Sequence, residues 1–175
     1  MNELQEAIYQ VIISIFKNEF LTKKFKIHDE YRGQKIIENS AIRYGILNYV
    51  AKYSLANDEY FISEKCFEYL TKQNLISDKG LLRGKKGTKY RFTFEHPVPS
   101  NIIADLLLKN CTDEVKLKNI LKETDIVTVL TYEEDEILNK SKLTSKMPSG
   151  WQIFQNSSFE RYTYAGINIP TRKIK

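Results

Sequence analysis

The pattern of apolar and polar positions predicts helices over most of the first 75 residues. Apolar side chains recur every three or four residues from Leu4 to Phe20, which places them on one stripe of a helix of about 19 residues. A second helical pattern covers residues 34–53, although a serine and a glycine weaken its middle. Ser63 is a typical N-cap for a third helix over residues 64–73. The stripe of the first helix comprises Leu4, Ile8, Val11, Ile12, Ile15, Phe16 and Phe20.

From Ser77 onward the pattern changes to short strands separated by turn residues. Leucines 81 and 82 and residues 90–94 flank a glycine-rich stretch, which predicts a β-hairpin. Pro97 ends the second strand, because proline lacks the amide hydrogen that a strand ladder needs. The β-branched run at residues 126–130 is typical of a buried strand.

Further helices are predicted after the hairpin. Thr112 is the expected cap of one of them, and Thr131 with Glu134 three residues later has the form of a capping box for another. Residues 161–164 are expected to form a last edge strand, and the basic end at residues 171–175 is expected to fray. The predicted helices span residues 101–110, 113–122 and 132–140.

These elements predict a single α+β domain over residues 1–175. A helical N-terminal half at residues 1–76 precedes an α+β part at residues 77–175, in which packed helices cover a small β-sheet with a basic hairpin. A chain of 175 residues that is 42% apolar and 28% charged can bury a core of that size, and only 7 Gly with 4 Pro argue against a disordered or low-complexity chain. The two cysteines, which lack a metal-site spacing, are predicted to be reduced structural thiols.

Charge points to an acidic partner. The net charge is +5 and the isoelectric point is near 9.0, which favours phosphate-bearing partners. No apolar run is long enough for a membrane span and the N-terminus has no secretory pattern, so we expect a soluble cytoplasmic protein. The cations concentrate in residues 79–91, where they are interleaved with aromatic residues, and this predicts contacts with DNA or RNA. These cations are Lys79, Arg83, Lys85, Lys86, Lys89 and Arg91.

Glu95 and His96, directly after the basic segment, are the candidate chemical centre. An imidazole can move protons near neutral pH, and a carboxylate beside it can assist. In a metal-free route these two residues would transfer protons while Arg161 or a hairpin cation stabilises charge on a phosphate. Adjacent strand residues point to opposite faces, so the two side chains converge only if the backbone bends at Pro97. The alternative is that His96 only hydrogen-bonds the strand-to-helix junction.

The stretch Glu95-His96-Pro97-Val98-Pro99 resembles the first half of the HNH nuclease motif, where Asp-His is followed by two residues and Pro, with Glu95 in the place of the Asp. The resemblance implies Glu95 as a ligand of a metal such as Mg²⁺, and His96 as the general base that activates water. No histidine follows His96, although that motif needs a further metal-binding residue downstream. On this interpretation the protein is a small phosphodiester-cleaving nuclease of the restriction, toxin or phage-defence kind.

Binding without chemistry is the rival class. The helix capped by Ser63 and the basic hairpin after it resemble the recognition helix and wing of a winged-helix DNA-binding domain. A DNA-binding regulator, or a phage or mobile-element inhibitor that binds a protein partner, would follow, and a homo-oligomer fits either class. Trp151 with the aromatic residues around Arg161 can stack the bases of a single strand, or can pin the end of the chain to the core.

Overall fold

The computed structural model describes residues 1–17, 41–57, 59–77, 80–81, 92–168 and 170–174. The chain has the predicted α+β architecture, with seven helices and a small mixed sheet in its described part. It divides into two compact units, each made of two stretches of sequence. Residues 100–125, which the sequence pattern assigns to the α+β part, belong to the helical unit. The units are Met1–Asn57 with Ser100–Asp125, and Asp58–Pro99 with Ile126–Lys175.

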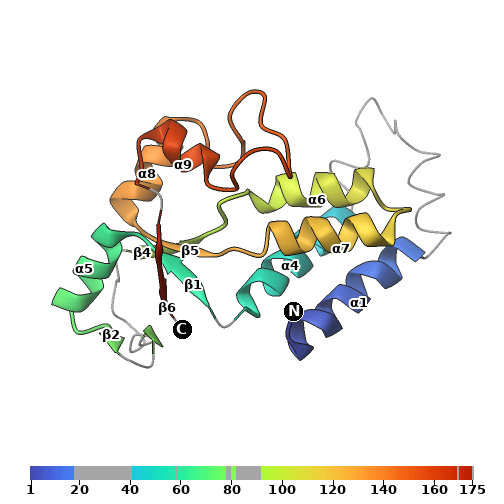
Figure 1. Ribbon diagram of the computed structural model, residues 1–175, viewed down its shortest axis with the longest axis horizontal. Helices are drawn as coiled ribbons and strands as arrows, with labels where there is room; N and C mark the ends of the chain where they lie inside the picture. Colours follow the sequence, from blue (N-terminus) through green and yellow to red (C-terminus); the bar gives the residue numbers. More distant parts are fainter. Residues whose placement is uncertain (18–40, 58, 78–79, 82–91, 169, 175) are drawn as a thin grey trace. The chain divides into compact units, whose positions relative to one another are not determined.

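The first unit is a bundle of helices. Helix α4 contacts both α1 and α6, and α6 contacts α7 (Figure 1). Their buried residues are mostly aliphatic and aromatic, which confirms the predicted helical core. Asp113, rather than Thr112, caps α7, because its carboxylate accepts from the Lys116 amide at 2.9 Å. The helices are α1 (Glu3–Lys17), α4 (Ala41–Leu55), α6 (Ser100–Lys109) and α7 (Glu114–Glu123).

The buried face of α1 differs from the predicted stripe. Leu4 and Val11 are exposed, whereas Gln5 and Tyr9 are buried. Gln5 reaches into the bundle because its amide donates to the Tyr53 carbonyl at 3.3 Å and to the Asp125 carboxylate at 2.7 Å. A glutamine satisfied in this way can be buried at little cost. The apolar pattern alone therefore placed the stripe one residue away from the face of α1 that is buried.

The second unit is built on a four-stranded mixed sheet with strand order β4-β5-β1-β6. β1 and β5 are parallel, while β4 pairs antiparallel with β5 and β6 pairs antiparallel with β1. A separate antiparallel pair, β2 and β3, follows helix α5. The strands are β1 (Tyr60–Ile62), β2 (Ile76–Ser77), β3 (Gly80–Leu81), β4 (Phe92–Glu95), β5 (Thr128–Thr131) and β6 (Arg172–Ile174).

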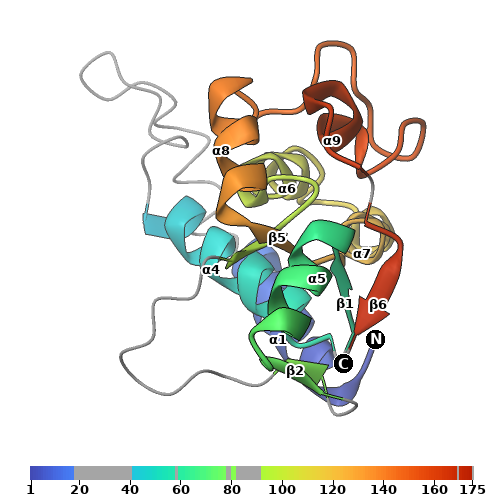
Figure 2. The same cartoon turned by 90° about the vertical axis from the view of Figure 1, so that its left-hand side faces the viewer.

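Helices cover both faces of this sheet (Figures 1 and 2). Val129 of β5 packs with residues of α5 (Glu64–Lys72) on one face. Leu130, the next residue, faces the other way and packs with α8 (Tyr132–Lys140) and α9 (Glu160–Ala165). This alternation is the two-residue period of a strand that is buried on both sides. The strand predicted from the β-branched run is confirmed, and it is the centre of the unit.

Two predictions for the end of the chain are wrong. Residues 161–164 lie in helix α9, which ends at Gly166 in the left-handed conformation, and they do not form an edge strand. Residues 172–174 do not fray, because they form β6 on β1. Ion pairs of Arg172 with Glu64 and of Lys173 with Glu59, at 3.4 and 3.2 Å, accompany this pairing. β1 itself lies in the segment that the pattern assigns to the helical part.

The predicted basic hairpin is only partly described. Leu81 pairs with Ile76 in the small sheet, whereas Phe92–Glu95 pairs with β5 in the large one. The described ends of the predicted hairpin therefore lie in different sheets and do not pair with each other. Residues 82–91 between these ends lie outside the described part of the chain. None of the described helices is long and apolar enough to cross a membrane.

Candidate functional site around Arg161

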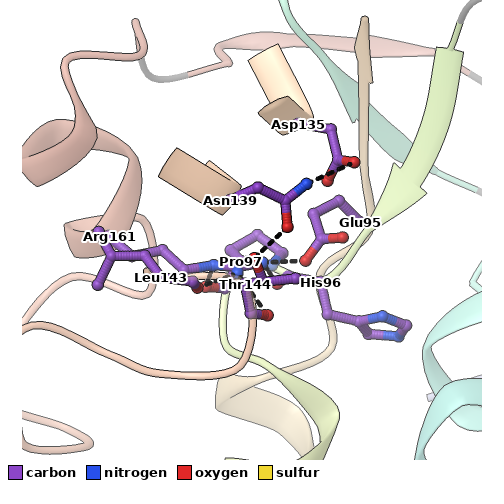
Figure 3. Close-up of polar contacts among 8 residues, drawn as sticks. All are labelled: Glu95, His96, Pro97, Asp135, Asn139, Leu143, Thr144 and Arg161. Atoms are coloured by element: carbon purple, nitrogen blue, oxygen red, sulfur yellow. Dashed lines mark hydrogen bonds and ion pairs between the residues drawn. The ribbon is translucent and has the colours of Figure 1, made fainter. Parts of the chain in front are cut away.

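Strand β4 directs Glu95 toward helix α9. Glu95 pairs in register with Thr128 of β5, and both residues lie on the sheet face that α8 and α9 cover. The carboxylate meets Arg161, which comes from the first turn of α9 (Figure 3). The structure therefore brings together two of the three residues that the sequence singled out for chemistry.

Arg161 is fully buried and acts as a hub of hydrogen bonds. Its Nε donates to the Pro97 carbonyl at 2.8 Å, and its Nη1 donates to the carbonyls of Leu143 and Thr144 at 2.8 and 3.2 Å. Its Nη2 donates to Glu95 Oε1 and to the carbonyl of His96. The planar guanidinium has five N–H donors and can bond several acceptors at once, whereas the ammonium group of lysine has only three. Arg161 thereby joins the end of β4 to the loop after α8.

The electrostatics of Glu95 follow from this burial. Desolvation raises the pKa of the Glu95 carboxyl, the ion pair with Arg161 lowers it, and the nearby Asp135 raises it again. The net shift is upward, since burial is the largest cause. Asp135 belongs to a polar chain in which Asn139 donates to Asp135 at 3.5 Å and Thr144 donates to Asn139 at 2.6 Å (Figure 3).

His96 does not join the Glu95 and Arg161 pair through its ring. Its carbonyl faces Arg161, while its imidazole points away from both partners (Figure 3). Burial lowers the pKa of His96 to about 4, and the charge of Arg161 adds to this shift, so the ring is neutral at neutral pH. Among the described residues its Nε2 is buried without a hydrogen-bond partner. The opposite-face rule for adjacent strand residues thus holds at this junction.

Two hydroxyl residues border this cluster: Thr128 pairs with Glu95 on the sheet, and the Tyr162 ring lies 5.4 Å from the Arg161 guanidinium carbon. Both hydroxyl oxygens are buried, and neither has a hydrogen bond of ordinary geometry in the described part of the chain. Burial raises the pKa of the Tyr162 phenol, and the Glu95 carboxylate raises it further while Arg161 opposes the shift. The surroundings of Arg161 are therefore a desolvated polar cluster, in which the guanidinium is the central donor.

A second buried carboxylate connects two strand-to-helix junctions of the same unit. Glu134 Oε2 accepts from the Ser63 hydroxyl at 2.7 Å and from the Thr131 amide at 2.9 Å. Ser63 caps α5 and Thr131 caps α8 through the predicted capping box, so one carboxylate serves both helix N-termini. The capping box was readable in the sequence, whereas the bond from Ser63, 71 residues away, was not.

The remaining predicted site residues are those assigned to nucleic-acid binding. Arg83, Lys85, Lys86, Lys89 and Arg91 all lie outside the described residues. Within the described residues, no group of three or more His, Cys, Asp or Glu side chains is placed to hold a metal ion. Glu95, which the HNH resemblance implies as a metal ligand, instead has its carboxylate on a guanidinium.

Sequence reasoning missed the backbone part of this site. The backbone carbonyls of Leu143 and Thr144 accept hydrogen bonds from Arg161 Nη1. Every residue has such a carbonyl, so the residue type does not indicate which carbonyl will be an acceptor. Comparison of the chain with protein-family models, with curated proteins and with solved structures found no significant match. The guide to function is therefore the chemistry of the residues themselves.

Proposed function

We propose that this protein binds nucleic acid through its basic segment, residues 79–91. The observation that carries the proposal is that these 13 residues contain six cations and no acidic side chain. Such a cluster attracts phosphate and gains affinity when counterions are released. The segment is joined directly to β4 at Phe92, a strand that is paired along its whole length with β5. A rigid strand next to a basic segment supports its use as a docking element.

The Arg161 hub supports binding over cleavage. A catalytic arginine must reach the phosphate, yet Arg161 is 0% exposed and uses every guanidinium nitrogen on the protein itself. Glu95 neutralises it. These two residues are therefore better suited to hold the end of β4 than to act on a substrate.

Phosphodiester cleavage is a second candidate, because His96 is neutral with an Nε2 that has no partner among the described residues. In that mechanism His96 alone would accept the proton of the attacking water or ribose hydroxyl. A pKa near 4 makes the ring a weak base, whereas general bases work best when their pKa lies near the working pH. We therefore rank phosphodiester cleavage below nucleic-acid binding as a candidate function. DNA and RNA fit equally well as substrates of such cleavage.

The test is a binding titration followed by fluorescence anisotropy. Labelled single-stranded DNA, duplex DNA and RNA are titrated with the wild-type protein and with Lys85→Glu/Lys86→Glu at several salt concentrations. We expect the variant to bind more weakly and the slope of log K against log salt to fall by about 1.4 to 1.8, the value for two phosphate contacts. The matched control is Lys52→Glu/Lys116→Glu, which makes the same charge change at exposed positions of the helical unit.

Three results decide between the candidates. If the wild-type protein binds no oligonucleotide even at low salt, the proposal is wrong. If the control variant weakens binding as much as the Lys85 and Lys86 variant, net charge rather than the segment is responsible. Cleavage is assayed on the same oligonucleotides with Mg²⁺, Mn²⁺ or EDTA. Turnover that is lost in His96→Asn with binding retained would establish the second candidate.

A further inference from the structure

The loop between α8 and α9 holds an aromatic ring out in solvent on a strained turn. Phe154 has a φ of +68° and its side chain is 50% exposed. Glycine or asparagine adopts this left-handed conformation at lower cost, so the turn itself does not explain a phenylalanine there. Strained residues of this kind concentrate at binding sites, which makes Phe154 a candidate contact residue.

Hydrogen bonds within the loop close the backbone turn that carries this ring. The Gln152 amide donates to Asn156 Oδ1 at 2.8 Å, and the Asn156 amide donates to the Gln152 carbonyl at 3.0 Å. Phe154 lies midway between these two residues, at the tip of the turn they close. Trp151 braces the turn, because its indole Nε1 donates to the Ser157 carbonyl at 3.0 Å. The ring is thus presented by a preformed loop rather than by a loose one.

The charge of this region suits a polyanion. Residues 141–159 contain two lysines, Lys142 and Lys146, and no acidic residue. Both lysines are exposed, as are most of the amide and hydroxyl side chains around Phe154. Cations combined with an exposed ring and polar side chains are the composition of surfaces that bind unpaired bases.

Arg161 fixes the base of this loop to β4. Its Nη1 holds the Leu143 and Thr144 carbonyls, while its other nitrogens hold the carbonyls of His96 and Pro97. The basic segment joins β4 at its other end, at Phe92. A strand of four residues is only about 10 Å long between its end residues. The loop and the basic segment are therefore attached to opposite ends of one short strand.

We propose that the α8–α9 loop, residues 141–159, is a base-stacking platform for single-stranded nucleic acid, with Phe154 as the stacking residue and Lys142 and Lys146 as phosphate contacts. The inference rests on the proposed nucleic-acid binding and assigns it the unpaired strand. Both views show the loop as a long connection that extends beyond α9 (Figures 1 and 2), and most of its residues from 149 to 157 are exposed. Bases of a duplex are already stacked on each other and cannot use the ring.

A lipid surface is the other class of partner that lysines beside an exposed ring can meet. The loop favours nucleic acid, because Phe154 is its only strongly exposed large apolar side chain and, apart from the half-buried Ile153, the neighbouring tip residues are glutamine, asparagine and serine. Stable membrane binding by an inserted segment needs considerably more apolar area than one ring offers. Vesicles are therefore included in the test as the competing partner.

The experiment uses the sole tryptophan of the chain, Trp151, as a reporter inside the loop. The wild-type protein is titrated with oligothymidylate, with a DNA duplex and with phosphatidylglycerol vesicles while tryptophan fluorescence is recorded. We expect quenching by oligothymidylate and little change with the duplex. Phe154→Gly, which removes the ring and relaxes the turn, should weaken oligothymidylate binding by about 5- to 100-fold, the effect of one lost stacking contact. Its affinity for the duplex should stay within about two-fold.

Two control variants separate stacking from structural effects. Phe154→Tyr keeps an aromatic ring and should retain wild-type affinity. Tyr44→Ala removes a ring that is 73% exposed in the helical unit and should change neither affinity. Thermal unfolding of each variant verifies that it is folded before it is titrated.

The outcomes separate this inference from the proposed function. Binding of oligothymidylate without tryptophan quenching, or with equal affinity in Phe154→Gly, overturns the platform and leaves the basic segment as the binding element. Equal weakening of single-strand and duplex binding also overturns it. A fluorescence change with vesicles but not with oligothymidylate assigns the loop to membranes instead. If no nucleic acid binds at all, both proposals fail.

Discussion

Replacing Arg161 by methionine is expected to destabilise the sheet-containing unit strongly. The change leaves the Glu95 carboxylate and four backbone carbonyls, those of His96, Pro97, Leu143 and Thr144, without their donor. Removing one partner of a buried ion pair costs about 3 to 5 kcal/mol. Glu95 is 19% exposed and can recover some hydration, and methionine fills much of the vacated volume, so we expect about 3 kcal/mol.

Lysine and a double substitution provide the controls. Arg161→Lys keeps the charge opposite Glu95 but has fewer donors, so it should lose less stability than Arg161→Met. Glu95→Gln alone leaves the guanidinium buried without a counter-charge. Combined with Arg161→Met it removes both charges, and the double variant should be more stable than the sum of the single effects predicts by at least about 1 kcal/mol.

Urea unfolding followed by Trp151 fluorescence measures these differences, because the single tryptophan lies in the same unit as Arg161. A loss below about 1 kcal/mol in Arg161→Met would show that the hub contributes little to stability. Additive effects of Glu95→Gln and Arg161→Met, within about 0.5 kcal/mol, would show that the two side chains are not coupled in solution. Either result refutes a stabilising role of the buried ion pair.

Two further predictions concern buried titratable groups. In the unfolded chain His96 takes up a proton below about pH 6.5, whereas in the folded chain it does so only near pH 4. As the pH falls through this window, the free energy of unfolding of the wild type, measured by urea titration, should therefore drop by up to about 3 kcal/mol more than that of His96→Asn. Parallel curves of unfolding free energy against pH for the two proteins would refute this. Glu134→Ala should cost about 2 to 4 kcal/mol by thermal or urea unfolding, because the Ser63 hydroxyl and Thr131 amide lose their acceptor. The exposed Glu136→Ala should cost about 0.5 kcal/mol or less, and equal losses would contradict the bridging role of Glu134.

Much of the candidate site could be predicted from the sequence, although its arrangement could not. Glu95, His96 and Arg161 stand out by residue type, and strand alternation predicts that the first two diverge. The contact between Glu95 and Arg161 spans 66 residues and leaves no trace in local pattern. The same is true of the acceptors of Leu143 and Thr144, because every residue carries a carbonyl.

The sequence by itself determined the local elements of this protein. The Ser63 cap, the Thr131 and Glu134 capping box and the buried strand that precedes it depend on neighbours within four residues or on a run of β-branched residues, so they were readable in advance. Tertiary structure decided which face of α1 is buried, that residues 161–164 are helical and that the end of the chain pairs with β1. Those outcomes depend on partners far away in the sequence, whose burial and hydrogen bonds outweigh local preference.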